Sequence, residues 1–238
     1  MGRALDHSSQ MMNVSHNIFK DLKTMLEYYQ TAGINSLPSV LPDIETGETG
    51  QQHDNDRLLK NLRDEIGDCK RCKLSKQRKN IVFGQGNPNA RLMFIGEAPG
   101  KEEDIQSLPF VGEAGMLLTR LIEKMGLKRS DVYIANIIKC RPPMNRDPDA
   151  DEIDACRAFI DKQIGIIRPE IIITLGRIAL QSLTGNPDIR ITAARGKFLE
   201  YKGIPVMPTF HPAYLLRNPG DKWKTWADAQ KVMERLKQ

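Results

Sequence analysis

The sequence has few of the residues that most often carry chemistry, with only four histidines and four cysteines among its 238 residues. It also lacks any apolar run near the roughly 18 residues that a membrane span requires. The N-terminus has neither the basic start nor the continuous apolar core of a signal peptide. We therefore expect a cytoplasmic protein with no membrane contact. Its length allows one substantial domain and an appendage.

Charge is distributed unevenly along the chain. Residues 1–56 contain three Lys/Arg and eight Asp/Glu, a net charge of −5, whereas residues 57–238 carry a net charge of +10. The densest cationic run is KRCKLSKQRK, residues 70–79, with six cations and no acid. A basic body favours a polyanionic partner such as nucleic acid, although such a run is about as often an ordinary solvated surface.

The chain divides into an acidic extension, residues 1–56, and a basic domain, residues 57–238. The extension combines a predicted amphipathic helix at 14–31 with a linker-like composition at 33–55. In the basic domain, a short helix at 57–66 precedes apolar runs of strand length at 91–96, 132–138, 170–175 and 204–210. Helical patterns occur at 115–125, 149–167, 177–183 and 223–236. This alternation predicts an α/β fold with a mainly parallel central sheet flanked by helices on both faces.

Unusual polar residues follow the predicted strands. The segment GEAPGKEED begins at the end of the first strand, Asn136 lies near the end of the second, and His211 follows the last. Because ligands bind at the carboxyl ends of parallel strands, we expect these residues to gather at one edge of the sheet. His211 precedes Pro212, which would hold it rigidly. A turn histidine whose nitrogens are satisfied by its neighbours is the open alternative.

The four cysteines form one C-x-x-C, Cys69 and Cys72, and two separate positions, Cys140 and Cys156. A zinc ribbon would carry a second C-x-x-C, and disulfides are rare in the cytoplasm. A redox C-x-x-C would leave the other two cysteines unexplained. Four thiolates from separate segments can hold an iron–sulfur cluster, which would order the basic run as a DNA-contacting loop. Burial of some cysteines as small hydrophobic residues is the open alternative.

Five features together resemble the family 4 uracil-DNA glycosylases, the iron–sulfur type. They are GEAPGKEED, LPFVGEAG (108–115), NIIKCRPP (136–143), HPAYLLRNP (211–219) and the cysteine spacing. The resemblance runs from about residue 57 to the C-terminus. It implies a DNA-repair hydrolase that flips uracil out of DNA and cuts its N-glycosidic bond, leaving an abasic site. It also implies a 4Fe-4S cluster held by Cys69, Cys72, Cys140 and Cys156.

The resemblance also implies roles for individual residues. The uracil pocket would be lined by Gly96, Ala98, Phe110, Asn136 and His211. Phe110 would lie against the flipped base, and the amide of Asn136 would match the O4 acceptor and N3–H donor of uracil. His211 would donate to the leaving anion near O2. Glu97 would stabilise the sugar cation or activate water, unless it is only a solvent-facing loop acid.

Charge and apolarity alone suggest further DNA contacts. Leu215, Leu216 and Arg217 suit a wedge that fills the vacated base stack beside a phosphate. Arg195 and Lys197 would hold phosphate. Ordinary packing and surface charge are the alternatives for both sets.

Two other functions are compatible with the same sequence features. The chain could be a non-catalytic iron–sulfur protein that binds DNA, or a glycosylase for a different deaminated base. A related branch attaches covalently to uracil-DNA through a histidine near the third cysteine, but residues 141–155 contain no histidine. We expect a monomer that acts on uracil in single- or double-stranded DNA.

Overall fold

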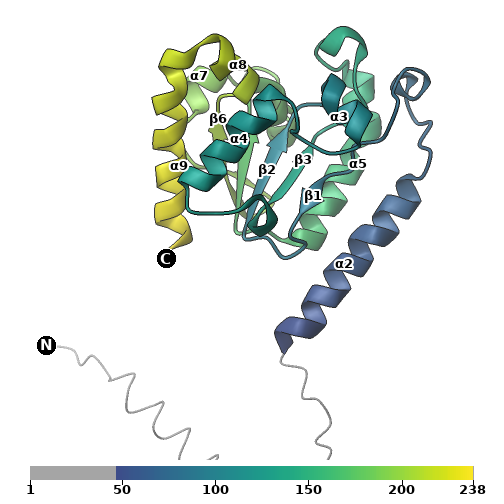
Figure 1. Ribbon diagram of the computed structural model, residues 1–238, viewed down its shortest axis with the longest axis horizontal. Coiled ribbons are helices and arrows are strands. Elements are labelled where there is room, and N and C mark those ends of the chain that lie inside the picture. The colour runs from purple at the N-terminus through teal and green to yellow at the C-terminus, as the bar shows by residue number, and fades with distance from the viewer. Residues whose placement is uncertain (1–46, 238) are drawn as a thin grey trace, which may run out of the picture. The chain divides into compact units, whose positions relative to one another are not determined.

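A six-stranded sheet forms the centre of the protein. The computed structural model describes residues 47–237, with side chains from residue 54. The strands are β1 (Gln85–Gly86), β2 (Leu92–Gly96), β3 (Tyr133–Asn136), β4 (Ile171–Leu175), β5 (Leu199–Tyr201) and β6 (Ile204–Thr209). Their order is β1-β3-β2-β4-β6-β5 (Figure 1). The four inner strands pair in parallel, and β1 and β5 join the edges antiparallel.

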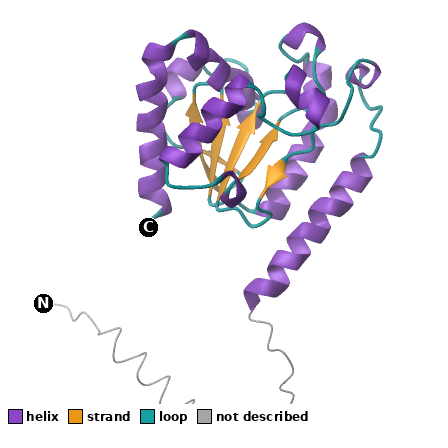
Figure 2. Cartoon of the chain, in the orientation of Figure 1, coloured by secondary structure: helices purple, strands orange, loops and turns teal. Residues whose placement is uncertain are grey.

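Helices cover both faces of this sheet (Figure 2). They are α2 (Gly47–Ile66), α3 (Lys101–Gln106), α4 (Glu113–Lys124), α5 (Ala150–Ile167), α6 (Arg177–Thr184), α7 (Ile191–Ala194), α8 (Pro212–Arg217) and α9 (Lys222–Leu236). Short 3-10 turns occur at η1 (Lys73–Lys76), η2 (Arg129–Asp131), η3 (Pro143–Asn145) and η4 (Pro219–Asp221). Buried side chains of α2, α5 and α6 pack on one face, and those of α4 and α9 pack on the other.

Strand β2 shows why the strands of the inner sheet are continuous apolar runs in the sequence. Met93 and Ile95 join the core beneath α5, whereas Leu92 and Phe94 join the core beneath α4 and α9. Every residue of the strand is buried because both faces of a parallel sheet are covered.

The winding of the sheet reverses at β2. The chain leaves β2 to form β3 on one side and later crosses to β4 on the other side. In doubly wound sheets, the crevice at such a reversal, outside the carboxyl ends of the strands, is where ligands bind. Gly96 and Asn136, the last residues of β2 and β3, are paired at this point.

The predicted fold class is confirmed. The four predicted strands and the predicted helices of the domain that follow residue 90 agree with the observed bounds to within two residues. The edge strands β1 and β5 and the short helices α3, α7 and α8 were not predicted. With two or three residues, the edge strands are too short to show a hydrophobic period.

Helix α2 begins earlier than predicted. We expected a helix from residue 57 after a linker, but α2 starts at Gly47, so the linker prediction was wrong for residues 47–55. The predicted helix at 14–31 and the rest of the linker lie outside the described residues. Within residues 47–237, no helix is both long and apolar enough to span a membrane.

We predict that Ile160→Ala lowers the free energy of unfolding by about 2–5 kcal/mol, because it opens a cavity between α5 and the sheet. Ile160 is fully buried in that interface. Urea denaturation measures the loss, and Asp154→Ala, on the exposed side of the same helix, should stay within about 0.5 kcal/mol. Equal effects of the two substitutions would contradict the assigned packing.

Candidate active site

The ends of β2 and β3 form the floor of the candidate site. A side chain at position 96 would collide with Oδ1 of Asn136 and with the ring of Phe110, so the close approach requires glycine. Asn136 is 1% exposed, and its Oδ1 has no hydrogen-bond partner among the described residues. A buried acceptor without a donor costs on the order of 1–3 kcal/mol. The floor therefore suits a ligand that supplies a hydrogen-bond donor.

Phe110 forms a wall of the site in an unusual backbone conformation. Its φ angle is 53°, in the left-handed region that non-glycine residues rarely adopt. Oε1 of Glu103 accepts hydrogen bonds from the backbone N–H groups of Val111 and Gly112, at 2.9 and 3.0 Å. Arg129 donates to the carbonyl of the residue before Phe110, over 2.9 Å. Contacts on both sides of Phe110 thus hold the strained loop in place.

His211 lies beside Phe110 as the N-cap of α8, with ring centroids 5.8 Å apart. Its Nδ1 accepts the backbone N–H of Ala213 at 3.1 Å, which leaves the proton of the neutral ring on Nε2. Burial lowers the pKa of His211 to about 4; the charge of Arg217 acts in the same direction, and Glu103 opposes it. At neutral pH, His211 is therefore an uncharged hydrogen-bond donor.

Glu97 follows the floor glycine directly and is half-buried. Burial is the main cause that raises its pKa to about 7; Asp147 also raises it, and Arg177 lowers it. Arg177 donates to Asp147 across 2.6 Å, so a charged pair that the sequence did not reveal lies near Glu97. A carboxyl group with this pKa can take up or release a proton near neutrality. Ala98, also half-buried, packs against the core beneath α5.

All four cysteines line one cavity with apolar walls. Cys140 and Cys156 are buried, and Cys69 and Cys72 are half-buried. Within the described part of the chain, no three His, Cys, Asp or Glu side chains are arranged to hold a single metal ion. In a cluster, each thiolate binds a different iron, so the cysteines can lie further apart than around one zinc ion. This arrangement fits an iron–sulfur cluster better than a zinc site.

Cationic and backbone donors surround the cysteine sulfurs. Three lie within hydrogen-bond distance: Arg71 Nη1 to Cys69 (3.6 Å), Arg78 Nη1 to Cys140 (3.6 Å) and the backbone N–H of Lys139 to Cys156 (3.3 Å). Such donors favour the anionic sulfurs of a bound cluster.

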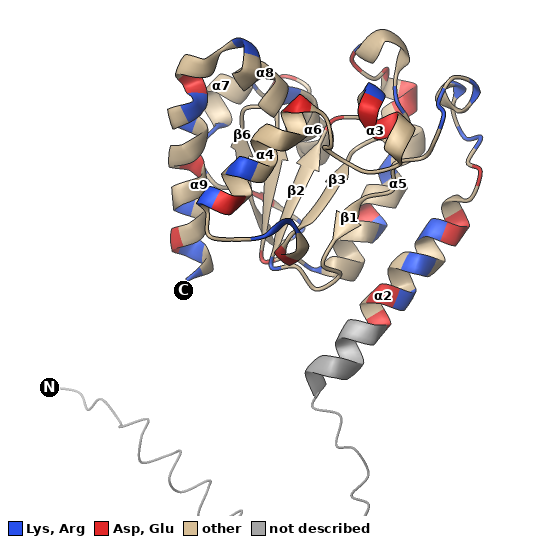
Figure 3. Ribbon diagram, viewed as in Figure 1, with Lys and Arg blue, Asp and Glu red and all other residues tan. Residues whose placement is uncertain are grey.

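The basic run therefore directs part of its charge inward. Lys73 pairs with Asp149 at 2.7 Å, and Arg78 pairs with Asp68 at 2.8 Å. Lys76 and Lys79 are exposed. Figure 3 shows that acidic and basic residues are interspersed along α2 and α9.

The residues predicted to contact DNA have different surroundings. Arg195 is 19% exposed and makes an ion pair with Asp228 at 2.5 Å, which counts against the phosphate contact that we expected. Leu215 is 4% exposed and lines an apolar pocket beneath α8, so it packs inward rather than forming a wedge. The remaining three are exposed: Lys197, Leu216 and Arg217.

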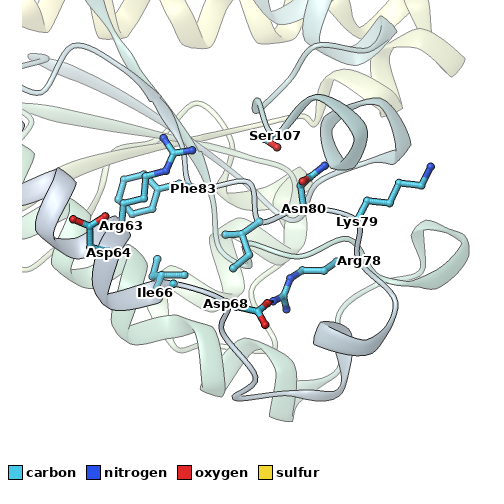
Figure 4. A pocket seen from close by; sticks show the side chains of 11 residues that line it. Arg63, Asp64, Ile66, Asp68, Arg78, Lys79, Asn80, Phe83 and Ser107 are labelled. Atoms are coloured by element: carbon cyan, nitrogen blue, oxygen red, sulfur yellow. The ribbon is translucent and has the colours of Figure 1, made fainter.

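A separate polar pocket lies between the end of α2 and the basic run (Figure 4). Arg78 lies beside Asp68 on one side of it, and Ser107 lies on another. Arg78 and Ile81 line both this pocket and the cysteine cavity. None of the residues at the ends of β2 and β3 lines it. The pocket is thus distinct from the candidate active site.

Sequence reasoning missed residues that support the site rather than line it. Glu103 lies inside the quoted GEAPGKEED segment, but nothing in the sequence links it to residues 111 and 112. Lys139 and Gln163 are buried polar residues, at 1% and 0% exposure. Gln163 occupies the apolar stripe of α5 between Ile160 and Ile167, and that misplaced polar residue was the available signal.

Known proteins are similar in sequence to this chain. A family model described as the uracil DNA glycosylase superfamily matches residues 83–237. A type-4 uracil-DNA glycosylase of Saccharolobus solfataricus is 50% identical over 183 residues, which cover 74% of this chain and 85% of that protein. Its counterpart in Thermotoga maritima is 46% identical over 164 residues, covering 68% of this chain and 85% of that protein. The chain belongs to the uracil-DNA glycosylase superfamily and, within it, to the type-4 glycosylases.

We predict that Glu103→Ala speeds hydrogen exchange at the amides of Val111 and Gly112 by about 10- to 100-fold, because each loses a charge-assisted hydrogen bond. Amide exchange followed by NMR measures the change. Glu123→Ala, at an exposed acid of α4, is the control and should leave both amides protected. Unchanged exchange in Glu103→Ala would mean that Glu103 does not hold the Phe110 loop.

Proposed function

We propose that the protein removes uracil from DNA by hydrolysing its N-glycosidic bond, leaving an abasic site. The observation that carries this proposal is the unpartnered, buried Oδ1 of Asn136 beneath the ring of Phe110. A non-catalytic DNA-binding protein would have no use for such a buried, unpartnered acceptor beside Phe110. The names of the type-4 relatives, three of which are matched over 84–85% of their length, support the same substrate.

Base recognition follows from the amide of Asn136. Its Oδ1 accepts a hydrogen bond from N3–H of uracil, and its NH2 group donates to O4. Cytosine has an acceptor at N3 and a donor at C4, so it presents the opposite pattern. The ring of Phe110 covers one face of the base, and Gly96 leaves room for it. This recognition requires the base to be flipped out of the duplex.

His211 stabilises the leaving group. When the bond between C1′ of the sugar and N1 of uracil breaks, the bonding electrons leave with the base, and negative charge spreads to O2. The Nε2–H of His211 donates to O2 as that charge develops. A fixed neutral donor of this kind contributes about 10²- to 10³-fold in rate. The low pKa of His211 keeps the ring uncharged across the physiological range.

Glu97 acts on the sugar side of the reaction. In its carboxylate form, it stabilises positive charge at C1′ or takes the proton of the water that adds there. Either role requires the ionised form. The charged pair of Asp147 and Arg177 modulates how readily Glu97 ionises.

The four cysteines hold a 4Fe-4S cluster in this proposal. When bound, the cluster supplies a rigid cross-link between the basic run, the turn after β3 and helix α5, and takes no part in bond cleavage. Leu216 fills the space left by the flipped base, and Arg217 and Lys197 contact phosphates. The glycosylase domain includes the whole of α2, so it begins at Gly47 rather than at the predicted residue 57, and the residues before it form the extension. A cytoplasmic monomer stays a prediction.

The proposed activity is tested with a duplex oligonucleotide that carries one uracil. The purified protein is incubated with this duplex, and alkali converts abasic sites into strand breaks that are resolved on a denaturing gel. We expect catalytic cleavage at uracil and none in a matched thymine duplex. If an intact cluster-bearing protein cut neither uracil nor another deaminated base, a DNA-binding function would replace the proposal.

We predict that Asn136→Ala lowers the single-turnover rate of uracil excision by at least about 100-fold, because both base-specific hydrogen bonds are lost. Binding to undamaged duplex, measured by fluorescence anisotropy, should change less than about twofold, since phosphates dominate that affinity. Asn61→Ala, exposed on α2, is the matched control. Full activity in Asn136→Ala would rule out the proposed uracil pocket.

We predict a rate that rises with pH and levels off above about pH 7. Glu97 has a raised pKa of about 7, so its carboxylate form is lost below that pH and the rate should fall about tenfold per pH unit. His211 stays neutral above about pH 4 and adds no second limb. Single-turnover rates from pH 5 to 9 measure the profile. In Glu97→Gln, the rate should no longer fall as the pH is lowered below about 7. If it still falls, a group other than Glu97 causes the pH dependence.

A further inference from the structure

A buried lysine lies between the candidate uracil pocket and the cysteine cavity. Lys139 is 1% exposed and separates Asn136 from Cys140 along the chain. Its Nζ donates to the backbone carbonyl of Asn136 at 2.7 Å and to Oε1 of Gln163 at 2.6 Å. Burying an ammonium group is costly unless its charge and its hydrogen bonds are compensated. The position of this lysine therefore requires an explanation.

Gln163 is itself held firmly. Its Nε2 donates to the carbonyl of Phe83 at 2.9 Å and to the hydroxyl of Tyr133 at 3.3 Å. Tyr133 begins β3 and Asn136 ends it. The network thus ties both ends of that strand to α5 through Lys139 and Gln163. A fully bonded buried network of this kind fixes one geometry.

Both oxygens that accept from the ammonium group are neutral. Lys139 also lines the cavity that Cys140 and Cys156 share. The backbone N–H of Lys139 also donates to the Sγ of Cys156, at 3.3 Å. Lys139 therefore contacts the cysteine site through its backbone N–H and the backbone of Asn136 through its side chain.

We propose that Lys139 is a positioning residue that couples the cysteine-held cluster to the uracil-reading amide of Asn136. Its side chain anchors the carbonyl of Asn136, and its backbone N–H donates to the Sγ of Cys156. This inference rests on the proposed function, in which Asn136 reads uracil and the four cysteines hold the cluster.

The carbonyl of Asn136 depends on this anchor because it lies at the end of β3, two residues beyond the last residue that pairs with β1. The next residue, Ile137, donates to the carbonyl of Gly96 at 2.9 Å, but the carbonyl of Asn136 turns toward Lys139. Without the ammonium group, a buried carbonyl would lose its donor, and the peptide would rotate to find another. A rotation there moves the side chain of Asn136, and a shift of about 1 Å at a reacting site costs about 10²-fold in rate.

The test compares Lys139→Met with Lys162→Met. Lys139→Met keeps the length of the side chain but removes its charge and hydrogen bonds, whereas Lys162 is an exposed lysine of α5 paired with Glu65. Three properties of the cluster-bearing proteins are measured. They are the single-turnover rate on a uracil duplex, the affinity for a duplex with a tetrahydrofuran abasic site, and the half-life of the visible cluster absorbance under ferricyanide.

We expect Lys139→Met to lose about 10- to 100-fold in uracil excision and to bleach about 10-fold faster, as outer-shell substitutions at metal sites do. Affinity for the abasic duplex should stay within about twofold, because that DNA has no base for Asn136 to read. Lys162→Met should match the wild-type protein in all three measurements. If Lys139→Met excised uracil and lost its cluster absorbance at the same rates as the wild-type protein, the inference would be overturned.

Two further variants separate positioning from simple stability. Lys139→Met combined with Gln163→Leu also takes the Gln163 donor from the carbonyl of Phe83 and the hydroxyl of Tyr133, so it should be less stable than the wild-type protein and should not regain the excision rate. A wild-type rate in this double variant would overturn the positioning role. If Lys139→Met does not accumulate as folded protein, Gln163→Asn is used instead, because its shorter side chain moves the amide oxygen away from the Nζ of Lys139. It should lose about 3- to 10-fold in excision, and no loss would equally overturn the inference.

The outcomes distinguish this inference from the proposed function. If the wild-type protein fails to excise uracil, the proposed function falls. If the wild-type protein is active and Asn136→Ala is equally active, the proposed uracil pocket is wrong. If both of those tests succeed and Lys139→Met behaves as wild type, only the role of Lys139 is lost.

Discussion

The pairing of Gly96 with Asn136 at the ends of β2 and β3 is the constraint on which the candidate site depends. Because Gly96 has no side chain, the ring of Phe110 and the amide of Asn136 can meet above the same point of the sheet. Other contacts hold Phe110 and Asn136 in this arrangement. Glu103 holds the loop that carries Phe110, and Lys139 holds the carbonyl of Asn136. The site is thus specified by one strand register and a small set of buried polar anchors.

The sequence predicts the inner part of the fold well because the signal there is strong. Buried parallel strands read as continuous apolar runs, and the long helices show a clear apolar stripe. The start of α2 was missed for the opposite reason, since residues 47–55 are polar and carry no stripe. Their composition resembles a linker, although the backbone is helical.

The lining of the site was more predictable than its support. Asn136 and His211 stand out because each interrupts an apolar segment at the end of a strand, and the family resemblance added Phe110 and Glu97. The supporting contacts join residues far apart in the chain, such as Gln163 and Phe83, which are separated by 80 positions. No local pattern encodes such a contact. Composition likewise could not show that Arg78 of the basic run donates to Cys140 or that Lys73 pairs with Asp149.

The most direct test of this account is a crystal structure of the protein with free uracil. The account predicts the base against Phe110, with N3 about 2.7–3.2 Å from Oδ1 of Asn136 and O2 at a similar distance from Nε2 of His211. Uracil bound with its N3–H directed away from Asn136, or bound only in the polar pocket beside Arg78, would contradict it.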